Sequence, residues 1–320
     1  MTKALGIFSG GLDSMLAVLL LRRAGVEVEV VTFATPFFSP RRARRSAEHI
    51  EVPLTVVEVG AEHLEQVVKN PRYGYGSAMN PCIDCHAYMF RKAGRIMEQR
   101  GFDFLFSGEV LGQRPMSQNR TALATVAKAS GYGERILRPL SARCLPPTPV
   151  EEAGLVERER LLDLSGRSRK RQMELAAAWG ISDFPSPAGG CLLTEPGFSR
   201  RLADLLRHQP QAGVAEVELL KHGRHFRLSP RARLVVGRNR GENRRLQQMA
   251  PPGAVVLVTR GHPGPVGIYL GPEGGELERA AAVVAGYSKA PPGSVVEVEA
   301  GQRRLRVVPL PRRQAHGMLV

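Results

Sequence analysis

The stretch "FSGGLDSMLAV", residues 8–18, joins a short apolar run to a longer one. Residues 4–8 are typical of a buried strand, and residues 14–24 are rich in strong helix formers with little polarity, so a strand, a turn and a helix are predicted. Two adjacent glycines let the backbone approach a ligand, and the amides at a helix start can cradle an anion. The turn therefore predicts a phosphate site, with an ordinary glycine turn capped by Asp13 or Ser14 as the alternative.

The string "SGGLDS" is neither the GxxxxGK[ST] motif nor the GxGxxG motif of the two common nucleotide folds. It resembles the loop of the PP-loop ATP pyrophosphatases, which cleave ATP between the α and β phosphates and adenylate a carbonyl oxygen of the substrate. The resemblance implies that ATP is bound by Ser9, Gly10, Gly11, Asp13 and Ser14. It also implies that Asp13 positions Mg²⁺.

Length and charge set the frame for the rest of the chain. The 320 residues suggest two or three domains, and a hydrophobic content of 43% is ordinary for a protein with real cores. The net charge of +15 indicates a polyanionic partner, although a merely basic surface would have the same composition. The apolar run at residues 15–21 follows an acidic turn rather than a basic segment, which argues against a signal peptide, so we expect a cytoplasmic protein.

Strand-like and helix-like segments alternate through the first half. Residues 26–33, 54–59 and 102–106 are β-rich, and helical patterns fill the gaps, so we predict an α/β fold with a parallel sheet covered by helices. Because ligands of such sheets bind at the carboxyl ends of the strands, Thr32, Phe33 and Gly108 are expected beside the opening loop.

The character of the chain changes near residue 197. A proline-rich joint at residues 145–150 precedes a helical stretch predicted over 150–179, and the segment 183–187 breaks the pattern again. Residues 198–248 hold twelve Lys or Arg against four Asp or Glu, and β-rich pieces separated by Gly and Pro turns follow. We therefore predict a nucleotide-binding and sulfur-transfer domain at 1–197 and a smaller, basic α+β domain at 198–320.

Four cysteines are the second source of chemistry. In a cytoplasmic protein a disulfide scaffold is not expected, so metal or redox chemistry is the better interpretation. Cys82 and Cys85 form a CxxC at the start of a predicted helix, which fits zinc, an iron–sulfur cluster, a redox dithiol or no site at all. Cys191 follows two glycines that allow a close approach, although a buried small hydrophobe is the plainer interpretation, and Cys144 has no comparable setting.

The segments "NPCIDC" and "GGCLLT" resemble the two active-site segments of the tRNA 2-thiouridylases. The resemblance implies that Cys82, Cys85 and Cys191 are catalytic and that they hold a [4Fe-4S] cluster with one iron left open for sulfide. Zinc on the same three cysteines, or a persulfide and disulfide cycle between Cys85 and Cys191, remains an alternative.

Two further segments extend the same resemblance. The stretch "SGEVLGQRPMSQN" stands where related synthases have a third nucleotide segment, which implies phosphate contacts for Gln113, Arg114, Ser117 and Gln118, with Arg114 neutralising the leaving pyrophosphate. An ordinary surface loop would explain Arg114 equally well. A basic helix start at Arg167, Arg169, Lys170 and Arg171 can bind tRNA phosphates, and a solvated helix face is its alternative.

The stretch "GRHFRLSPRARLVVGRNRGENRRL" resembles the RNA-binding module of the NFACT group of ribosome-associated proteins. Closely spaced arginines on a β-rich module offer an electrostatic surface for an RNA backbone. With His225 and Phe226 as the few aromatic rings nearby, recognition by shape and phosphate is favoured over base stacking. The candidate RNA-binding residues here are Arg224, Arg227, Arg231 and Arg238.

These observations predict an ATP-dependent tRNA sulfurtransferase that uses ATP and Mg²⁺, acts on tRNA and takes sulfur from sulfide or a persulfide carrier. We expect 4-thiouridine at tRNA position 8, with 2-thiouridine as the close alternative. Two other classes remain open: a PP-loop ligase or amidating enzyme with structural zinc, and a non-catalytic RNA-binding protein with a nucleotide-sensing loop. A monomer and a homodimer are both compatible with the composition.

Overall fold

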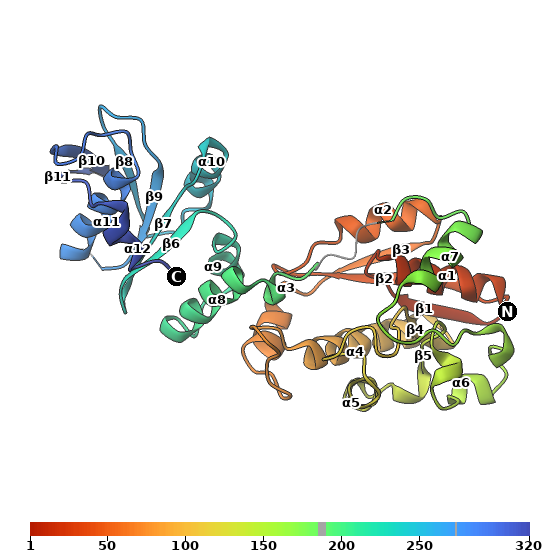
Figure 1. The fold of residues 1–320 in the computed structure, drawn as a ribbon. Coiled ribbons are helices and arrows are strands. Elements are labelled where there is room, and N and C mark those ends of the chain that lie inside the picture. The colour runs from red at the N-terminus through yellow and green to blue at the C-terminus, as the bar shows by residue number, and fades with distance from the viewer. Residues whose placement is uncertain (185–189, 273) are drawn as a thin grey trace. The chain divides into compact units, whose positions relative to one another are not determined.

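The computed structural model describes residues 1–184, 190–272 and 274–320. The chain divides into two compact units, Met1–Thr194 and Glu195–Val320, each with its own hydrophobic core (Figure 1). The boundary predicted after residue 197 falls inside the first turn of α8 (Pro196–His208). That helix belongs to the second unit, and the Glu195 carboxylate caps it by accepting hydrogen bonds from the amides of Gly197 and Phe198.

Unit 1 contains a five-stranded parallel sheet in the order β3-β2-β1-β4-β5, which confirms the predicted α/β class. The strand direction is uniform, but the order reverses between β1 and β4. This is the point at which open parallel sheets bind ligands. The strands are β1 (Lys3–Ile7), β2 (Glu27–Ala34), β3 (Leu54–Glu58), β4 (Phe104–Ser107) and β5 (Ile136–Leu137).

Helices cover both faces of this sheet (Figure 1). Ala4 of β1 packs into the core under α1, α2 and α7, and its neighbour Leu5 packs into the opposite core under α4 and α5. Burial on both faces explains why the strands are continuously apolar. The helices are α1 (Leu12–Arg23), α2 (Arg41–His49), α3 (Gly60–His63), α4 (Cys82–Arg100), α5 (Arg120–Ser130), α6 (Pro149–Glu152) and α7 (Lys170–Ala178).

The helix predicted over 150–179 is wrong. The structure has α6 and α7 there, and residues 153–169 between them form turns and a short 3₁₀ helix at Arg158–Arg160. Gly154 and Gly166 adopt positive φ angles of 67° and 84°, which end a right-handed helix. The pattern break predicted at 183–187 lies largely outside the described residues.

Unit 2 is a six-stranded antiparallel sheet in the order β11-β10-β8-β9-β7-β6, with α11 packed over its apolar face. In β10 the valines and Ala300 are buried and the glutamates between them are half-exposed, the alternation of a sheet with one covered face. The strands are β6 (Arg224–Ser229), β7 (Ala232–Val236), β8 (Val255–Thr259), β9 (Val266–Leu270), β10 (Val296–Ala300) and β11 (Arg303–Val307). The remaining helices are α9 (Val214–Leu219), α10 (Arg240–Met249), α11 (Gly275–Gly286) and α12 (Arg312–His316).

Across the described parts of both units, every helix is too short or too polar to cross a bilayer.

Candidate functional site

The loop between β1 and α1 lies at the reversal point of the sheet, next to the end of β4. A methyl group on Gly10, whose φ is 71°, would come within 2.6 Å of the Arg42 carbonyl group of α2. One on Gly108 would come within 2.6 Å of the Asp13 backbone. The loop is therefore clamped between α2 and the end of β4, and glycine at these positions serves packing. Gly11 differs, because a methyl group there would meet only the Ser9 hydroxyl, at 3.5 Å.

No side chain caps the N-terminus of α1, so the first backbone amides of this helix have no side-chain acceptor and are available to a ligand. The serine hydroxyl groups hold the loop itself: Ser14 Oγ donates to the Gly11 carbonyl at 2.8 Å, and Ser46 Oγ donates to the Gly10 carbonyl at 2.8 Å. Ser9 Oγ accepts from the Gly11 amide at 3.4 Å. A preformed loop with uncapped amides at the start of a helix is suited to bind an anion.

Asp13 lies at the centre of this site. Its Oδ2 accepts a hydrogen bond from Gln113 Nε2 at 3.1 Å, and its Oδ1 is buried without a protein partner. Burial raises the pKa of Asp13, and the Gln113 hydrogen bond and the charges of Arg169 and Arg114 offset part of that rise. The structure thus brings together Asp13, Gln113 and Arg114, as predicted residues of one site. Arg169, expected to hold RNA, lies close enough to act on the Asp13 carboxylate.

Two other polar atoms near Asp13 are also buried without a protein partner, Arg169 Nε and Gln172 Nε2, and so is Gln118 Oε1 in the segment that follows Arg114. Because buried polar groups are almost always hydrogen-bonded, orphan donors and acceptors gathered in one place indicate a polar ligand. Gln118 was expected near the phosphates, whereas Gln172 on α7 carries no sequence signal.

Thr32 and Phe33 do not join this group. Both lie inside β2 and are buried, and the Phe33 ring packs in the core shared with Leu5 and Val59. Because β2 continues to Ala34, the Phe33 side chain is buried under α4, and the assignment of Phe33 to nucleotide binding stays a prediction.

The three predicted thiols come together. Cys82 and Cys85 lie in the first turn of α4. Cys191, close to the C-terminal end of the sequence of unit 1, lies within electrostatic reach of both. Burial raises the pKa of Cys85 well above its usual value, and the charges of Cys191 and Cys82 add to the rise. Burial likewise raises the pKa of Cys191 to about 11, against a lowering by Arg114. Arg114 therefore lies within electrostatic reach of both Asp13 and Cys191.

All four cysteines are free thiols. Within residues 1–184, 190–272 and 274–320, no three His, Cys, Asp or Glu side chains are already arranged around a metal position. Gly189, the first of the two glycines before Cys191, lies outside the described residues. Cys144 is separate from the site, and its Sγ donates to the Asp163 carbonyl at 3.2 Å.

Two unpredicted side chains contact the thiols. His63 Nε2 lies 3.2 Å from Cys85 Sγ, and Asn80 Nδ2 donates to Cys82 Sγ at 3.3 Å. Burial lowers the pKa of His63 to about 4, so its ring is neutral at pH 7. The rings of Phe38 and Tyr88 each lie 5.7 Å from the His63 ring, which keeps this side of the thiol site apolar. Only Asn80, next to the CxxC, could have been suspected from the sequence.

A buried carboxylate, Glu109, connects α4, the helix that carries Cys82 and Cys85 (the thiol helix), to the end of β4. Glu109 Oε1 bonds His86 Nδ1 at 2.8 Å, and Oε2 accepts from Arg138 Nε at 2.9 Å and Ser107 Oγ at 3.0 Å. Burial alone would raise the pKa of Glu109, but Arg138 and His86 outweigh it and lower the pKa to about 2. The ionised carboxylate thereby fixes the residue after Cys85 against the end of β4.

The predicted RNA-binding arginines differ in their surroundings. Arg227 pairs with Asp204 and Arg238 with Glu242, each at 2.5 Å, and the Arg224 guanidinium lies 5.0 Å above the Tyr287 ring. Arg231 is exposed on the β6–β7 turn, and Arg167 and Lys170 are exposed in unit 1. Arg233 is buried, and burial lowers its pKa to about 10. Nothing in the sequence distinguishes Arg233 from the exposed arginines near it.

Comparison with known families finds two matches. Residues 1–143 match the family described as thiamine biosynthesis protein (ThiI), and residues 223–315 match the NFACT protein RNA binding domain. These matches confirm the resemblances stated from the sequence, and each lies within one structural unit.

Among curated proteins, a probable tRNA sulfurtransferase of Oceanobacillus iheyensis is 30% identical over 143 residues, which are 43% of this chain and 34% of that protein. The chain thus spans about a third of the length of the curated relative.

Solved structures resemble the chain more distantly. A predicted subunit of tRNA methyltransferase from Methanocaldococcus jannaschii matches 56% of this chain and 76% of its own, at 14% identity and a TM-score of 0.36. The C-terminal part of the fibronectin/fibrinogen-binding protein from Streptococcus suis matches 48% and 79%, at 17% identity and a TM-score of 0.29. The U34-tRNA thiolase NcsA from Methanococcus maripaludis, with its [4Fe-4S] cluster, matches 69% and 73%, at 18% identity and a TM-score of 0.34.

Proposed function

We propose that this chain, which joins a ThiI-type nucleotide domain to an NFACT-type RNA-binding domain, is an ATP-dependent tRNA sulfurtransferase acting in the cytoplasm. It adenylates a carbonyl oxygen of a tRNA uridine and replaces that oxygen with sulfur. The observation that carries the proposal is the place of the segment Gln113–Arg114: Gln113 Nε2 donates to Asp13 Oδ2 at 3.1 Å, and Arg114 lies within electrostatic reach of both Asp13 and Cys191. We therefore assign the nucleotide loop and the thiols to one reaction site.

In the first step the uridine oxygen attacks the α-phosphorus of ATP, and the bond to the β-phosphate breaks. The uncapped amides of α1 bind the phosphates that leave, and Arg114 and Arg169 neutralise their charge. Asp13 fits a role as Mg²⁺ ligand, because its Oδ1 is buried with no protein partner. In the second step sulfide forms the carbon–sulfur bond, and AMP departs with the original oxygen. When the sulfur comes from a persulfide carrier, a thiol reductant supplies the two electrons that bring the persulfide sulfur to the sulfide level.

The thiol site fits a [4Fe-4S] cluster by its donor set, since three cysteines lie within electrostatic reach of one another and Cys85 contacts the neutral His63 ring on its apolar side. Cys82, Cys85 and Cys191 would hold it, and a cluster held by three cysteines supplies one iron with an open coordination position for sulfur. Asn80 and His63 fix the orientation of two of these side chains through their contacts with Cys82 and Cys85. The same three thiols could serve as a zinc site or in a persulfide cycle, and we place the cluster first.

We propose 4-thiouridine at tRNA position 8 as the product, with 2-thiouridine as the alternative. Nucleoside analysis of tRNA treated with the protein, ATP, Mg²⁺ and sulfide distinguishes the two. Iron, acid-labile sulfide and zinc measured on protein purified without oxygen distinguish the thiol chemistries: about four irons and four sulfides support the cluster, zinc alone supports a structural metal, and no metal supports persulfide chemistry.

The first prediction concerns Cys191. We expect Cys191→Ser to abolish thiouridine formation, because a serine hydroxyl can neither ligate iron nor carry sulfur, while the affinities for ATP and tRNA change by less than about twofold. Cys144→Ser is the matched control and should keep full turnover, since Cys144 lies outside the site. Full activity of Cys191→Ser would contradict the assignment of the sulfur site.

A further inference from the structure

A pocket of about 190 Å³ lies between the segment 66–73 and one face of α4, and Ala129 of α5 completes its lining. Its wall includes Arg72, Tyr73, Asp84, Tyr88 and Arg91. We infer that this pocket holds one unpaired nucleotide of the tRNA, with its base on the Tyr73 ring and its phosphate at the guanidinium groups of Arg72 and Arg91. The inference rests on the proposed function and adds a substrate-recognition subsite to it.

The loop that forms the pocket is fixed to the thiol helix. Asp84 Oδ1 accepts from the Arg72 amide and Oδ2 accepts from the Tyr73 amide, each at 3.0 Å. Tyr75 Oη donates to the Val68 carbonyl at 2.6 Å. Because these bonds hold the loop before any ligand arrives, Tyr73 is presented in a fixed position, which lowers the entropy lost on binding.

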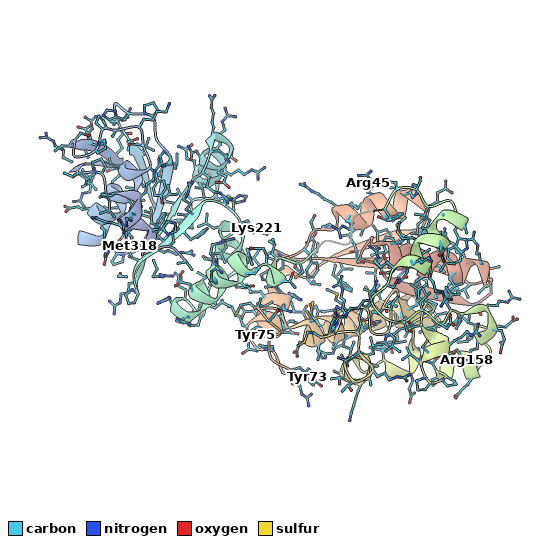
Figure 2. All side chains as sticks on the ribbon, viewed as in Figure 1. Arg45, Tyr73, Tyr75, Arg158, Lys221 and Met318 are labelled. Carbon is cyan, nitrogen blue, oxygen red and sulfur yellow. The ribbon has the colours of Figure 1, made fainter. Side chains whose placement is uncertain are left out.

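The exposed groups of the loop have the chemistry of a nucleotide site. Tyr73 and Tyr75 are 41% and 42% exposed, although large apolar side chains of unit 1 are mostly buried (Figure 2). The Arg72 guanidinium lies 5.6 Å from the centre of the Tyr73 ring. Unpaired bases stack on aromatic rings and guanidinium planes, and phosphates pair with arginine.

Charge and size restrict the occupant further. Each Asp84 oxygen accepts a hydrogen bond from a backbone amide, and the guanidinium groups of Arg72 and Arg91 in the same wall favour an anion. At about 190 Å³ the pocket is smaller than the roughly 300–1,000 Å³ of small-molecule sites, which excludes ATP and admits a single base. An RNA nucleotide meets both conditions.

The pocket lies beside the first turn of α4, which also carries Cys82 and Cys85. Asp84 stands between Cys82 and Cys85, and the Tyr88 ring in the pocket wall contacts His63, whose Nε2 lies 3.2 Å from Cys85 Sγ. A base on Tyr73 is therefore beside the reacting uridine and is not the reacting base itself. Binding of this neighbour would position the target uridine at the thiol site.

The test is the kinetics of the full-length protein with tRNA, ATP, Mg²⁺ and sulfide. Tyr73→Ala should raise the KM for tRNA about tenfold, because loss of one base–aromatic stack commonly has an effect of this size, with kcat and the KM for ATP within twofold. Tyr73→Phe keeps the ring and should stay within twofold of the wild type. Lys128→Ala, which removes an exposed charge outside the pocket, is the matched control.

A second measurement locates the contact directly. Ultraviolet crosslinking of the protein to tRNA transcripts that contain 5-iodouridine should yield a modified peptide spanning residues 71–78, and Tyr73→Ala should lose it. An unchanged KM for tRNA together with an unchanged crosslink would overturn the inference. So would a Tyr73→Ala protein with a raised KM for a protein persulfide donor and an unaltered reaction with free sulfide, since the pocket would then dock the donor.

The two proposals can fail separately. If the wild type forms no thiouridine, the proposed function fails, and the crosslink and the tRNA affinity still test the pocket without turnover. If the wild type thiolates tRNA but Tyr73→Ala matches it in affinity and crosslinking, only the pocket inference fails.

Discussion

Glu109, just after the end of β4, is a buried carboxylate with three side-chain partners. It is buried and bonds His86, Arg138 and Ser107, and these partners lower its pKa from 4.5 to about 2 despite burial. A folded pKa below the unfolded one stabilises the protein at pH values above about 4.5, and this stabilisation is lost as the pH falls toward 2. At pH 7 it amounts to about 3 kcal/mol.

Substitution of Glu109 tests this account. Glu109→Gln should lower the free energy of unfolding at pH 7 by about 3 kcal/mol, because it leaves the buried Arg138 guanidinium without its counter-charge. The difference between variant and wild type should shrink as the pH falls from about 5 to 2, since the wild type then loses the same charge. Urea unfolding at several pH values measures both effects.

The control for this series is a surface ion pair. Glu157 pairs with Arg160, and both side chains are more than half exposed, so Glu157→Gln should change the stability by less than about 1 kcal/mol at any pH. An equal loss in both variants, or a Glu109→Gln deficit that does not vary with pH, would show that Arg138 does not hold Glu109 ionised.

Residues differ in how far the sequence could predict them. Asp13 and the cysteine pair stand in local motifs whose spacing carries the chemistry, so the sequence alone is enough to select them. Glu109 could not be given its role, because its partners His86 and Arg138 are 23 and 29 residues away in the chain. Such pairs depend on which strands and helices become neighbours, and periodicity does not encode that.

At the scale of elements, glycines divide into two classes that look alike in sequence. Gly108→Ala should destabilise the protein by about 1–3 kcal/mol, because the methyl group would lie 2.6 Å from the backbone at the start of α1. Gly11→Ala should change the free energy of unfolding by less than about 1 kcal/mol, since only the Ser9 hydroxyl is near. Thermal or urea unfolding without nucleotide measures the contrast.

The affinity for ATP tests the two variants by a second criterion. Both should lose affinity for ATP, Gly108→Ala because α1 is displaced and Gly11→Ala because a methyl group intrudes where the phosphates approach. Calorimetric titration with ATP and Mg²⁺ measures this. A Gly11→Ala protein that unfolds early, or one that binds ATP as the wild type does, would contradict the division of roles.

The same scale shows why strands were easier to predict than helices. β-branched runs such as residues 254–259 mark strands by composition alone, and the structure has β8 there. Residues 150–179 have helical composition, yet Gly154 and Gly166 take up left-handed conformations, and two α-helices, α6 and α7, form in place of one continuous helix. Helix propensity is a weak tendency that turns and tertiary packing override.

At the scale of the whole molecule, the charge of +15 overstates the surface available to RNA. Arg227 and Arg238 are each neutralised by a carboxylate at 2.5 Å, and Arg233 is buried. Arg231, exposed on the β6–β7 turn, has no such carboxylate among the described ion pairs. The basic composition therefore predicts a polyanionic partner, while the pairing decides which arginines are free to contact it.

This difference predicts how the affinity for tRNA depends on salt. Each phosphate contact releases bound counterions, so Arg231→Ala should weaken tRNA binding and reduce the slope of log K against log salt concentration by about one. Arg238→Ala should alter the slope less, because the Glu242 carboxylate already compensates that guanidinium. The effect should be the same for different tRNAs, since phosphates carry no sequence information. Fluorescence anisotropy at about 50–300 mM salt provides the measurement, and equal slopes for wild type and Arg231→Ala would exclude the β6–β7 turn from the RNA interface.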